Sequence, residues 1–349
     1  MRTTLLCRTA EQAERIAQER QNSRYLAGIE LPERLKVRVL GARDDQFLRS
    51  EVVFLAVPSA GLAAALAELS RQGVAGDAGV ISLAKGLVPP QGTPPTLALE
   101  RAFGPERIGC VGGPAHAREM IESGAGLVCA SHSEVLAHRV AGTFQRAGVV
   151  CEVSSDPVGV ELAGCAKNAA ALAAGATEAQ GLNAAGMAAS DIFLEVMALA
   201  ERDGGDVRTF VGRAGLGDLV ATALAPTSRN RSAGELLADG VPASAIPERL
   251  DQAVEALETV PLLARAIEQA GLEAPITSAL ARLIDGALPL EEWVALVRAK
   301  QPEPARFRGR ATGWFERMRA WFARRRERRQ AARGGAQESP RTVARLDGP

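Results

Sequence analysis

The chain has 349 residues, of which 47% are hydrophobic and 23% are charged, a composition typical of a globular protein with room for two domains. Lys plus Arg and Asp plus Glu both number 41, but residues 301–349 hold 13 arginines against 5 acidic residues, so this segment is +8 and residues 1–300 are −8. The negative net charge of residues 1–300 excludes a basic nucleic-acid-binding domain there. Only the basic segment 301–349 could bind an acidic partner.

The five cysteines indicate a reducing environment. None of them forms a C-x-x-C pair, and no Cys or His cluster has the spacing of metal ligands, so the sequence predicts neither a disulfide framework nor a metal site. The start of the chain lacks the long apolar segment of a signal peptide, and no uncharged apolar run reaches the ~18–20 residues of a membrane span. We therefore expect a cytoplasmic protein without a transmembrane segment.

Short apolar runs alternate with helix-like stretches from residue 1 to residue 153. Seven of these runs are predicted strands: Thr3–Leu6, Lys36–Leu40, Val52–Val57, Gly79–Leu83, Ile108–Val111, Gly126–Cys129 and Val149–Val153. Ala10–Gln21 and Gly61–Arg71, which lie between them, have the pattern of helices. Strands that alternate with helices predict an α/β fold, a doubly wound, Rossmann-like parallel sheet with helices on both faces.

The character of the chain changes after Asp156-Pro157. Residues 154–300 are rich in Ala, contain no convincing strand and are predicted to form a second, all-α domain that binds the substrate. Residues 301–349 are predicted to be a basic, disordered tail. Aromatic residues such as Trp314 and Trp321 fall at helical spacing among the arginines of this tail, which favours an alternative in which it touches a membrane surface.

Two segments of the first part carry candidate ligand-binding residues. Lys85, in Ala84-Lys85-Gly86, follows a predicted strand, and doubly wound sheets bind ligands at the carboxyl ends of their strands. Gly113 follows the next predicted strand, where a glycine lets backbone N–H groups approach a ligand. Taken alone, the first segment is more typical of a surface Lys before a loop glycine.

Lys167 and Asn168 lie in the first helix of the predicted second domain. Small residues recur there every three or four positions, which holds this helix in close packing with its neighbours. A partly desolvated Lys in that position has its pKa lowered toward the range of general acid–base catalysis. The alternative is a Lys that extends from an interdomain helix to solvent.

A third candidate site combines two segments about ten residues apart. Gly215-Leu-Gly217-Asp218 predicts a turn into a helix, with Asp218 free to cap that helix or to bind a substrate hydroxyl. Ser228, Arg229 and Asn230 offer donors that suit a phosphate. Together the two segments indicate a site for a small phosphorylated polyol.

Taken in order, these motifs resemble the bacterial NAD(P)-dependent glycerol-3-phosphate dehydrogenase family. The resemblance runs from about Leu5 to Val297, and its pieces are RTAEQAERIAQERQNSRYLAGIELP, FLAVPS, AKG, GGPAHAREM, VELAGCAKNAAALAAG, GRAGLGDLVAT, TSRNR and AVEALETV. It implies a dinucleotide-binding domain at residues 1–153, NAD or NADP as the cofactor, and a possible homodimer. It also implies reversible reduction of dihydroxyacetone phosphate to sn-glycerol 3-phosphate for glycerophospholipid synthesis.

The resemblance further implies a role for each matched residue. Lys167 would be the catalytic proton donor. The residues implied for substrate binding are Lys85, Gly113, Asn168, Asp218, Ser228, Arg229 and Asn230. Those implied for cofactor binding are Arg8, Lys85, Ala117, Arg229 and Glu255, with Arg8 placed to receive the 2′-phosphate of NADP.

The start of the sequence departs from the family pattern. Relatives begin with a strand and a Gly-x-Gly-x-x-Gly turn, whereas the first glycine here is Gly28 and the sequence opens at what resembles the second strand. In a 3-2-1-4-5-6 sheet the missing strand is central, and each buried backbone group left unpaired costs ~1–3 kcal/mol. We therefore expect that the natural product starts earlier, and that the chain as written folds poorly and binds its cofactor weakly.

Two alternatives remain open. The lack of a glycine-rich turn and Ala115 in place of Ser favour a degenerate paralogue that binds a metabolite or partner without turnover. The other alternative is a related two-domain hydroxyacid or ketopantoate-type reductase, although the segments around Asp218 and Arg229 argue against it.

Overall fold

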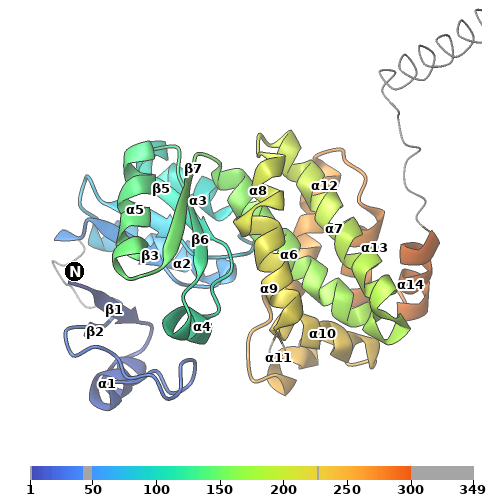
Figure 1. Ribbon diagram of the computed structural model, residues 1–349, viewed down its shortest axis with the longest axis horizontal. Helices are drawn as coiled ribbons and strands as arrows, with labels where there is room; N and C mark the ends of the chain where they lie inside the picture. Colours follow the sequence, from blue (N-terminus) through green and yellow to red (C-terminus); the bar gives the residue numbers. More distant parts are fainter. Residues whose placement is uncertain (1, 42–48, 226–227, 300–349) are drawn as a thin grey trace, which may run out of the picture. The chain divides into compact units, whose positions relative to one another are not determined.

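The computed structural model describes residues 2–41, 49–225 and 228–299. Strands occupy the first part of this range and helices the second, as the blue-to-green and green-to-orange halves of the ribbon show (Figure 1). The predicted tail at 301–349, with its membrane-surface alternative, lies outside the described residues. The change from strands to helices falls between Ser154 and Pro157, while the division into domains 1–153 and 154–300 stays a prediction.

Each of the seven predicted strands is present, within one or two residues of its expected bounds. They are β1 (Thr4–Cys7), β2 (Lys36–Val39), β3 (Val52–Leu55), β4 (Gly79–Ser82), β5 (Ile108–Gly112), β6 (Gly126–Ala130) and β7 (Val150–Ser154). The strand order is β1-β2 in one sheet and β3-β4-β5-β6-β7 in another. The pairing is parallel except between β5 and β6, so the predicted parallel sheet is confirmed with one antiparallel step.

The two sheets do not share a backbone ladder within the described residues. The faces of β1 and β2 are covered by side-chain packing instead: Cys7 packs on Ala13 and Ile16 of α1 (Ala10–Glu19), and Leu6 and Leu40 pack toward the core beneath β3. The edges of β1 and β3 thus lack the strand-to-strand hydrogen bonds that join the members of each sheet.

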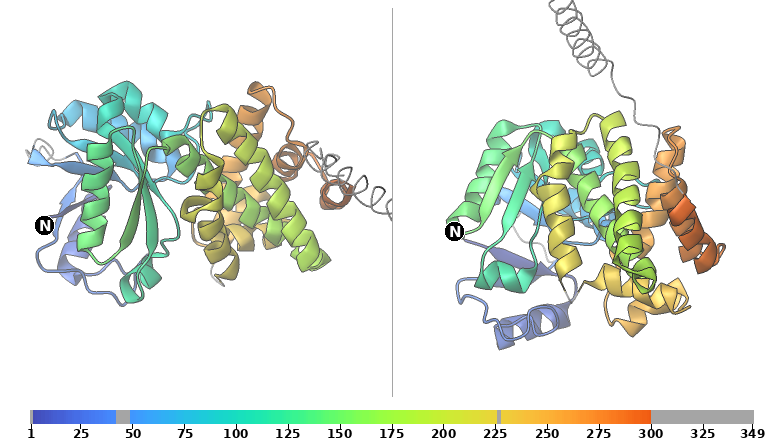
Figure 2. Two further views of the ribbon diagram at one scale, coloured as in Figure 1. Left: turned by 45° about the horizontal axis from the view of Figure 1, so that its top comes forward. Right: turned by 45° about the vertical axis from the view of Figure 1, so that its right-hand side comes forward.

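Helices cover both faces of the five-stranded sheet (Figure 2). They are α2 (Leu62–Gln72) and α3 (Pro95–Phe103) on one face and α5 (Glu134–Arg146) on the other, with the short α4 (Ala117–Glu122) before β6. Neighbouring residues of β4 point to opposite faces, so Val80 packs with Leu62 and Leu99 whereas Ile81 packs with Leu136. Burial on both sides explains why consecutive residues of this strand, Val80 and Ile81, are both apolar.

The second half is built around one long helix, α6 (Pro157–Thr177), whose side chains are almost all buried. The helices that follow are α7 (Leu182–Arg202), α8 (Val207–Val211), α9 (Asp218–Leu224), α10 (Arg229–Ala238), α11 (Ile246–Arg249), α12 (Glu255–Gln269), α13 (Pro275–Ile284) and α14 (Leu290–Ala299). Gly234 of α10 lies so close to α6 that an added Cβ would stand 2.1 Å from Leu172 O. The small residues read from the sequence therefore serve close helix packing, and they fix α6 in place.

Candidate active site

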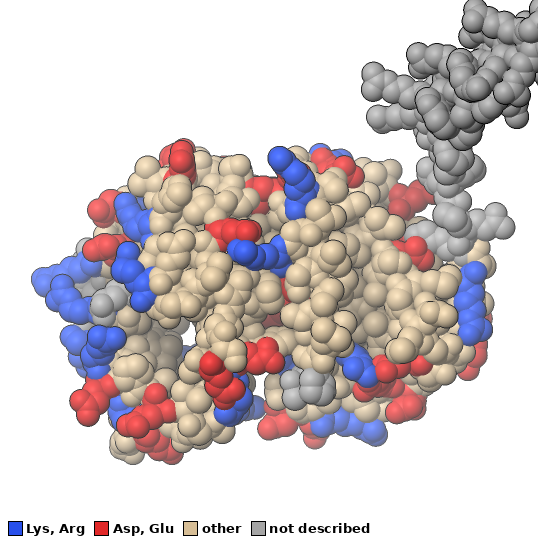
Figure 3. Space-filling model, viewed as in Figure 1, with Lys and Arg blue, Asp and Glu red and all other residues tan. Residues whose placement is uncertain are grey.

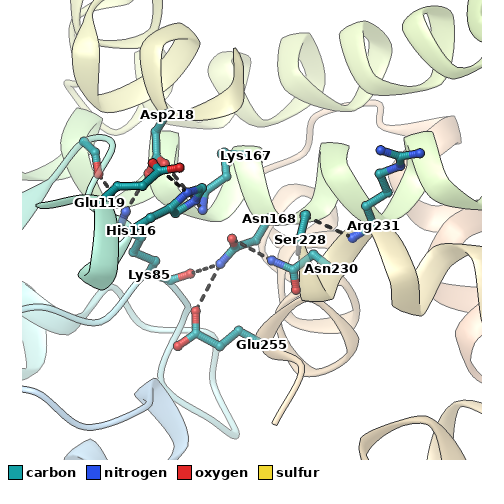
Figure 4. Close-up of polar contacts among 11 residues, drawn as sticks. Lys85, His116, Glu119, Lys167, Asn168, Asp218, Ser228, Asn230, Arg231 and Glu255 are labelled. Atoms are coloured by element: carbon teal, nitrogen blue, oxygen red, sulfur yellow. Dashed lines mark hydrogen bonds and ion pairs between the residues drawn. The ribbon is translucent and has the colours of Figure 1, made fainter. Parts of the chain in front are cut away.

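The site forms where the carboxyl end of β4 meets α6 and α9. Lys85 lies three residues beyond β4, and its Nζ donates to Asp218 Oδ2 at 2.6 Å and to the carbonyl oxygen of Gly113 at 2.8 Å. Figure 4 shows Lys85, Lys167 and Asp218 pointing toward one another from three different segments. Residues 133 positions apart in the chain are thus joined at the sheet edge where a doubly wound fold binds ligands.

Asp218 is shared by two lysines. Its carboxylate is 1% exposed, and Lys167 Nζ lies 3.6 Å from the Oδ1 atom that Lys85 does not contact. Burial and, to a lesser extent, the charge of Lys85 lower the pKa of Lys167 to about 8, while Asp218 and Glu255 oppose the shift. The sequence prediction that Lys167 is desolvated on a packed helix is thereby met, since the residue is 7% exposed.

Amide side chains connect this cluster to α10 and α12. Asn168 Nδ2 donates to the carbonyl oxygen of Lys85 at 2.9 Å and to Glu255 Oε2 at 3.1 Å, and its Oδ1 accepts from Asn230 Nδ2 at 2.8 Å. The Oδ1 atom of Asn230 accepts in turn from the backbone N–H of Ala256 at 3.3 Å. Both amides are therefore fixed in orientation, and Glu255 is held beside the lysines.

Two glycines allow the backbone to approach closely here. A Cβ on Gly86 would stand 2.7 Å from Ser59 Oγ and 2.8 Å from Thr259 Oγ1, so a side chain at this position has no room. Gly113 has φ +99°, a conformation that favours glycine, and a Cβ there would stand 2.5 Å from Gly126 O. The Gly113 carbonyl consequently faces Lys85 in a turn that other residues would strain.

The structure also contains a contact that the sequence reading missed. Glu161 of α6 accepts hydrogen bonds from the backbone N–H of Thr96 at 2.9 and 3.2 Å and from Thr96 Oγ1 at 2.6 Å. Burial raises the pKa of Glu161 to about 8, which the bonds from Thr96 partly oppose. The signal for this contact was the seven-residue spacing from Glu161 to Asn168, which places both side chains on one face of α6.

The predicted site residues divide into two groups. Those joined in the cluster are Lys85, Gly113, Lys167, Asn168, Asp218, Asn230 and Glu255. Ser228 caps α10 by accepting from Arg231 N at 3.4 Å, and Arg229 is exposed, donating to Ala253 O at 3.3 Å. Arg8 follows β1 and Ala117 begins α4, both exposed and outside the cluster.

The donors around the cluster fit a dinucleotide at its two ends. Thr259 Oγ1, one turn along α12 from Glu255, is buried beside Gly86 and has no hydrogen-bond partner among the described residues. Arg8 presents an exposed cation directly after the carboxyl end of β1. The carboxylate of Glu255 accepts a hydrogen bond from the Asn168 amide, and a carboxylate can accept further bonds from hydroxyl or amide donors of a ligand.

Comparison with known proteins gives one consistent result. A family model described as NAD-dependent glycerol-3-phosphate dehydrogenase N-terminus matches residues 1–137, and the corresponding C-terminus model matches residues 156–295. The chain is 35% identical over 313 residues to the glycerol-3-phosphate dehydrogenase (NAD(P)+) of Parafrankia sp. strain EAN1pec, covering 87% of this chain and 91% of the relative. It is 32% identical over 294 residues to the protein of the same name from Alcanivorax borkumensis, covering 82% and 84%.

The fold has a counterpart among solved structures. The crystal structure of glycerol-3-phosphate dehydrogenase from Coxiella burnetii superposes with a TM-score of 0.78 at 23% sequence identity, covering 85% of this chain and 91% of that chain. At this identity the superposition establishes the arrangement of sheet and helices, and the sequence matches establish the relationship.

Proposed function

Because the chain belongs to the NAD-dependent glycerol-3-phosphate dehydrogenase family, we propose that it catalyses the reversible reduction of dihydroxyacetone phosphate to sn-glycerol 3-phosphate. The observation that carries this proposal is the pair Lys85 and Lys167 on one buried Asp218, at the ligand-binding edge of the sheet. The enzyme is an oxidoreductase that acts on a CH–OH group and uses NAD or NADP. Its product serves glycerophospholipid synthesis.

Lys167 is proposed to move the proton. The nicotinamide supplies or accepts the hydride when it is bound, so the protein must provide a proton to the substrate oxygen at C2. An ammonium with a pKa of about 8 is protonated at neutral pH yet releases its proton readily, which suits a general acid. Its charge also stabilises negative charge that develops on that oxygen.

Lys85 and Asp218 are proposed to hold the substrate, with Asn168 and Gly113 lining the same space. Asp218 fixes both ammonium groups, so their positions are set before the substrate arrives. Ser228, Arg229 and Asn230, at the start of α10, are proposed to meet the phosphate through charge-assisted and neutral hydrogen bonds. Arg229 must turn from its contact with the Ala253 carbonyl to do so.

The cofactor would lie between the first part and α12. Arg8 is proposed at the adenosine end, and Ala117, Lys85, Arg229 and Glu255 at the nicotinamide end. The unpartnered hydroxyl of Thr259 supports a ligand on the Glu255 side of the cluster.

A direct assay tests the proposal. Purified chain is mixed with dihydroxyacetone phosphate and NADH or NADPH, and the absorbance at 340 nm is followed. Oxidation of either cofactor that depends on the substrate supports the enzyme. If no oxidation occurs while calorimetry detects cofactor or substrate binding, the degenerate paralogue is the better description. Turnover of ketopantoate in preference to dihydroxyacetone phosphate would favour the related reductase.

A cytoplasmic location is also proposed. All five cysteines are free and buried, which fits a reducing compartment. The 21-residue helix α7 is long and apolar enough to cross a membrane, but its Glu195 accepts hydrogen bonds from the N-terminus of α13, as in the core of a helical domain. Fractionation of cells that express the chain tests the location. Contact of the basic tail with a membrane surface or an acidic partner stays a prediction.

We further propose that the chain forms a homodimer. Uncharged side chains gather on the face formed by α7, α8 and α9 (Figure 3), and large apolar residues there are exposed. These residues are Met187, Leu194, Val211, Leu216, Val220 and Leu224. Exposed apolar surface of this extent is typical of protein interfaces. Sedimentation equilibrium should give a dimer that Leu194→Glu dissociates, and a monomeric wild-type protein contradicts the proposal.

A further inference from the structure

Glu161 is a buried acid that the proposed chemistry does not use. It is 3% exposed and lies on α6, six residues before Lys167. Its described partners are the N–H and hydroxyl of Thr96, in the first turn of α3. A carboxyl group buried without a neighbouring cation is costly, so its place in the fold calls for a physical reason.

The segment that Glu161 holds is the one that carries Lys85. Residues 83–94 connect β4 to α3, and Thr96 lies just past the end of this connection. The connection is closed on itself by bonds from Val88 N to Thr93 O at 2.8 Å and from Gly92 N to Val88 O at 3.0 Å. A displacement of its α3 end is therefore transmitted along a compact turn toward Lys85.

One face of α6 contacts this connection at three positions along the helix. Glu161 binds Thr96, an added Cβ on Gly164 would stand 3.4 Å from the Cβ of Lys85, and Asn168 donates to the carbonyl oxygen of Lys85. The spacings of three and four residues put these three side chains in one row. Lys167 stands beside the last of them, so α6 holds both lysines of the site, one as its own side chain and one through this row.

We propose that Glu161 is a positioning residue, whose carboxyl binds Thr96 and thereby fixes the connection 83–94 on α6, so that Lys85 reaches Asp218 beside Lys167. The consequence for turnover rests on the proposed function. The loosening of the connection when Glu161 is replaced does not rest on that function, because it follows from the contacts of Glu161, Gly164 and Asn168 alone.

The chain contains a matched control for this contact. Glu195 of α7 is 6% exposed and accepts from Ile276 N at 3.2 Å, Thr277 N at 2.8 Å and Thr277 Oγ1 at 2.8 Å, at the start of α13. The chemistry repeats that of Glu161, including a Pro at the first position of the helix, but α13 contributes no residue to the lysine cluster. Removal of either carboxyl disturbs a helix start, and only removal of Glu161 disturbs the support of Lys85.

The experiment compares Glu161→Met, Glu161→Gln and Glu195→Met in the full chain. Met keeps the length of the side chain and removes the acceptor, whereas Gln keeps an acceptor. Hydrogen exchange in residues 84–96 should quicken about tenfold or more in Glu161→Met, stay near wild type in Glu161→Gln, and be unaffected in Glu195→Met, where residues 274–280 exchange faster. Unchanged exchange at 84–96 in Glu161→Met, or equal loosening there in Glu195→Met, overturns the proposal.

Turnover gives the second measurement. Glu161→Met should lower kcat roughly 10–100-fold with the KM for the nicotinamide cofactor unchanged, Glu161→Gln should restore most of it, and Glu195→Met should remain within about twofold. Equal losses in both Met variants, measured on folded protein, contradict the assignment. If the wild-type chain shows no turnover, the proposed function fails and the exchange data alone decide the role of Glu161.

A variant pair on Thr96 covers the case in which Glu161→Met does not fold. Thr96→Val removes the hydroxyl donor and keeps the backbone N–H, and Thr96→Ser keeps both. Thr96→Val should loosen residues 84–96 about threefold or more, and Thr96→Ser should not. Equal exchange in the two variants overturns the proposal.

Discussion

The two lysines that share Asp218 belong to contrasting regions of the molecule. Lys167 lies on α6, where nearly every side chain is buried, and its own side chain is 9% exposed. Lys85 lies on the connection between β4 and α3, and its side chain is 23% exposed. The same residue type thus stands once on a rigid helix that shifts its pKa and once on a segment that other residues hold in place. This difference supports the proposal that Lys167 on the helix transfers the proton and that Lys85 on the connection captures the substrate.

Replacement of Lys167 is the strongest test of the different roles proposed for the two lysines. Lys167→Ala should lower kcat by ~10³-fold or more, because general acid catalysis and a stabilising charge are lost together. Cofactor affinity, measured by fluorescence titration, should stay within about threefold. Lys36→Ala, at an exposed position on β2, is the control and should leave turnover unchanged. A kcat of Lys167→Ala near that of wild type would contradict the proposal that Lys167 is the proton donor.

The shared carboxylate gives the next largest effect. Asp218→Asn should lower kcat/KM by about 10²-fold, because both ammonium groups lose the charge that orients them. Since the charge of Asp218 raises the pKa of Lys167, the pKa seen in the pH–rate profile should also move down. A variant that loses rate with an unmoved profile would indicate that Asp218 orients the lysines without setting their protonation.

Reduction and oxidation should depend on pH in opposite directions. Reduction of dihydroxyacetone phosphate needs protonated Lys167, so its kcat should fall about tenfold per pH unit above pH 8. Oxidation of glycerol 3-phosphate needs the neutral amine, so its kcat should rise as pH approaches 8 and then level off. Stopped-flow rates in both directions from pH 6 to pH 10 check this. Parallel profiles would rule out Lys167 as the titrating group.

The smallest expected effect concerns the positioning contact and folding stability. Burial raises the pKa of Glu161 from 4.5 to about 8, so between these values the folded chain holds a proton that the unfolded chain has lost. The stabilisation from this group is complete below pH 4.5 and is lost as pH rises toward 8. Urea unfolding at pH 5.5 and 8.5 should show a larger decline for wild type than for Glu161→Gln. Equal declines would mean that Glu161 titrates normally.

Most of the strands were predictable because they are short apolar runs between turns. All seven were found: β4 and β5 are buried along their whole length, which removes most polar residues from a strand regardless of its partners, whereas β2 alternates exposed and half-buried residues. The antiparallel direction of β6 was missed for the same reason, because an apolar run such as Gly126–Ala130 carries no record of its direction.

The sequence predicted which residues lie in the lysine cluster, but it did not predict the contacts between them. The order of motifs identified Lys85, Lys167 and Asp218, and the structure joins them. The bonds from Asn168 connect residues 83 and 87 positions away, and that from Thr96 to Glu161 spans 65 positions. Such partners are chosen by the packing of α6 against α3 and α12, which no local pattern encodes. The roles assigned to Arg8, Ala117, Ser228 and Arg229 stay predictions.

The separation of the β1–β2 sheet has a consequence for how the protein opens. This sheet is tied to the rest by the packing of Leu6 and Leu40, by a bond from Arg118 to the carbonyl oxygen of Ala27, and by the surface pair Arg24–Asp251. No backbone ladder among the described residues has to break for it to detach, so it can unfold locally at less than the global free energy. If the cofactor binds at Arg8 as proposed, it stabilises this sheet by mass action, and proteolysis at the N-terminal end should slow as the cofactor concentration rises.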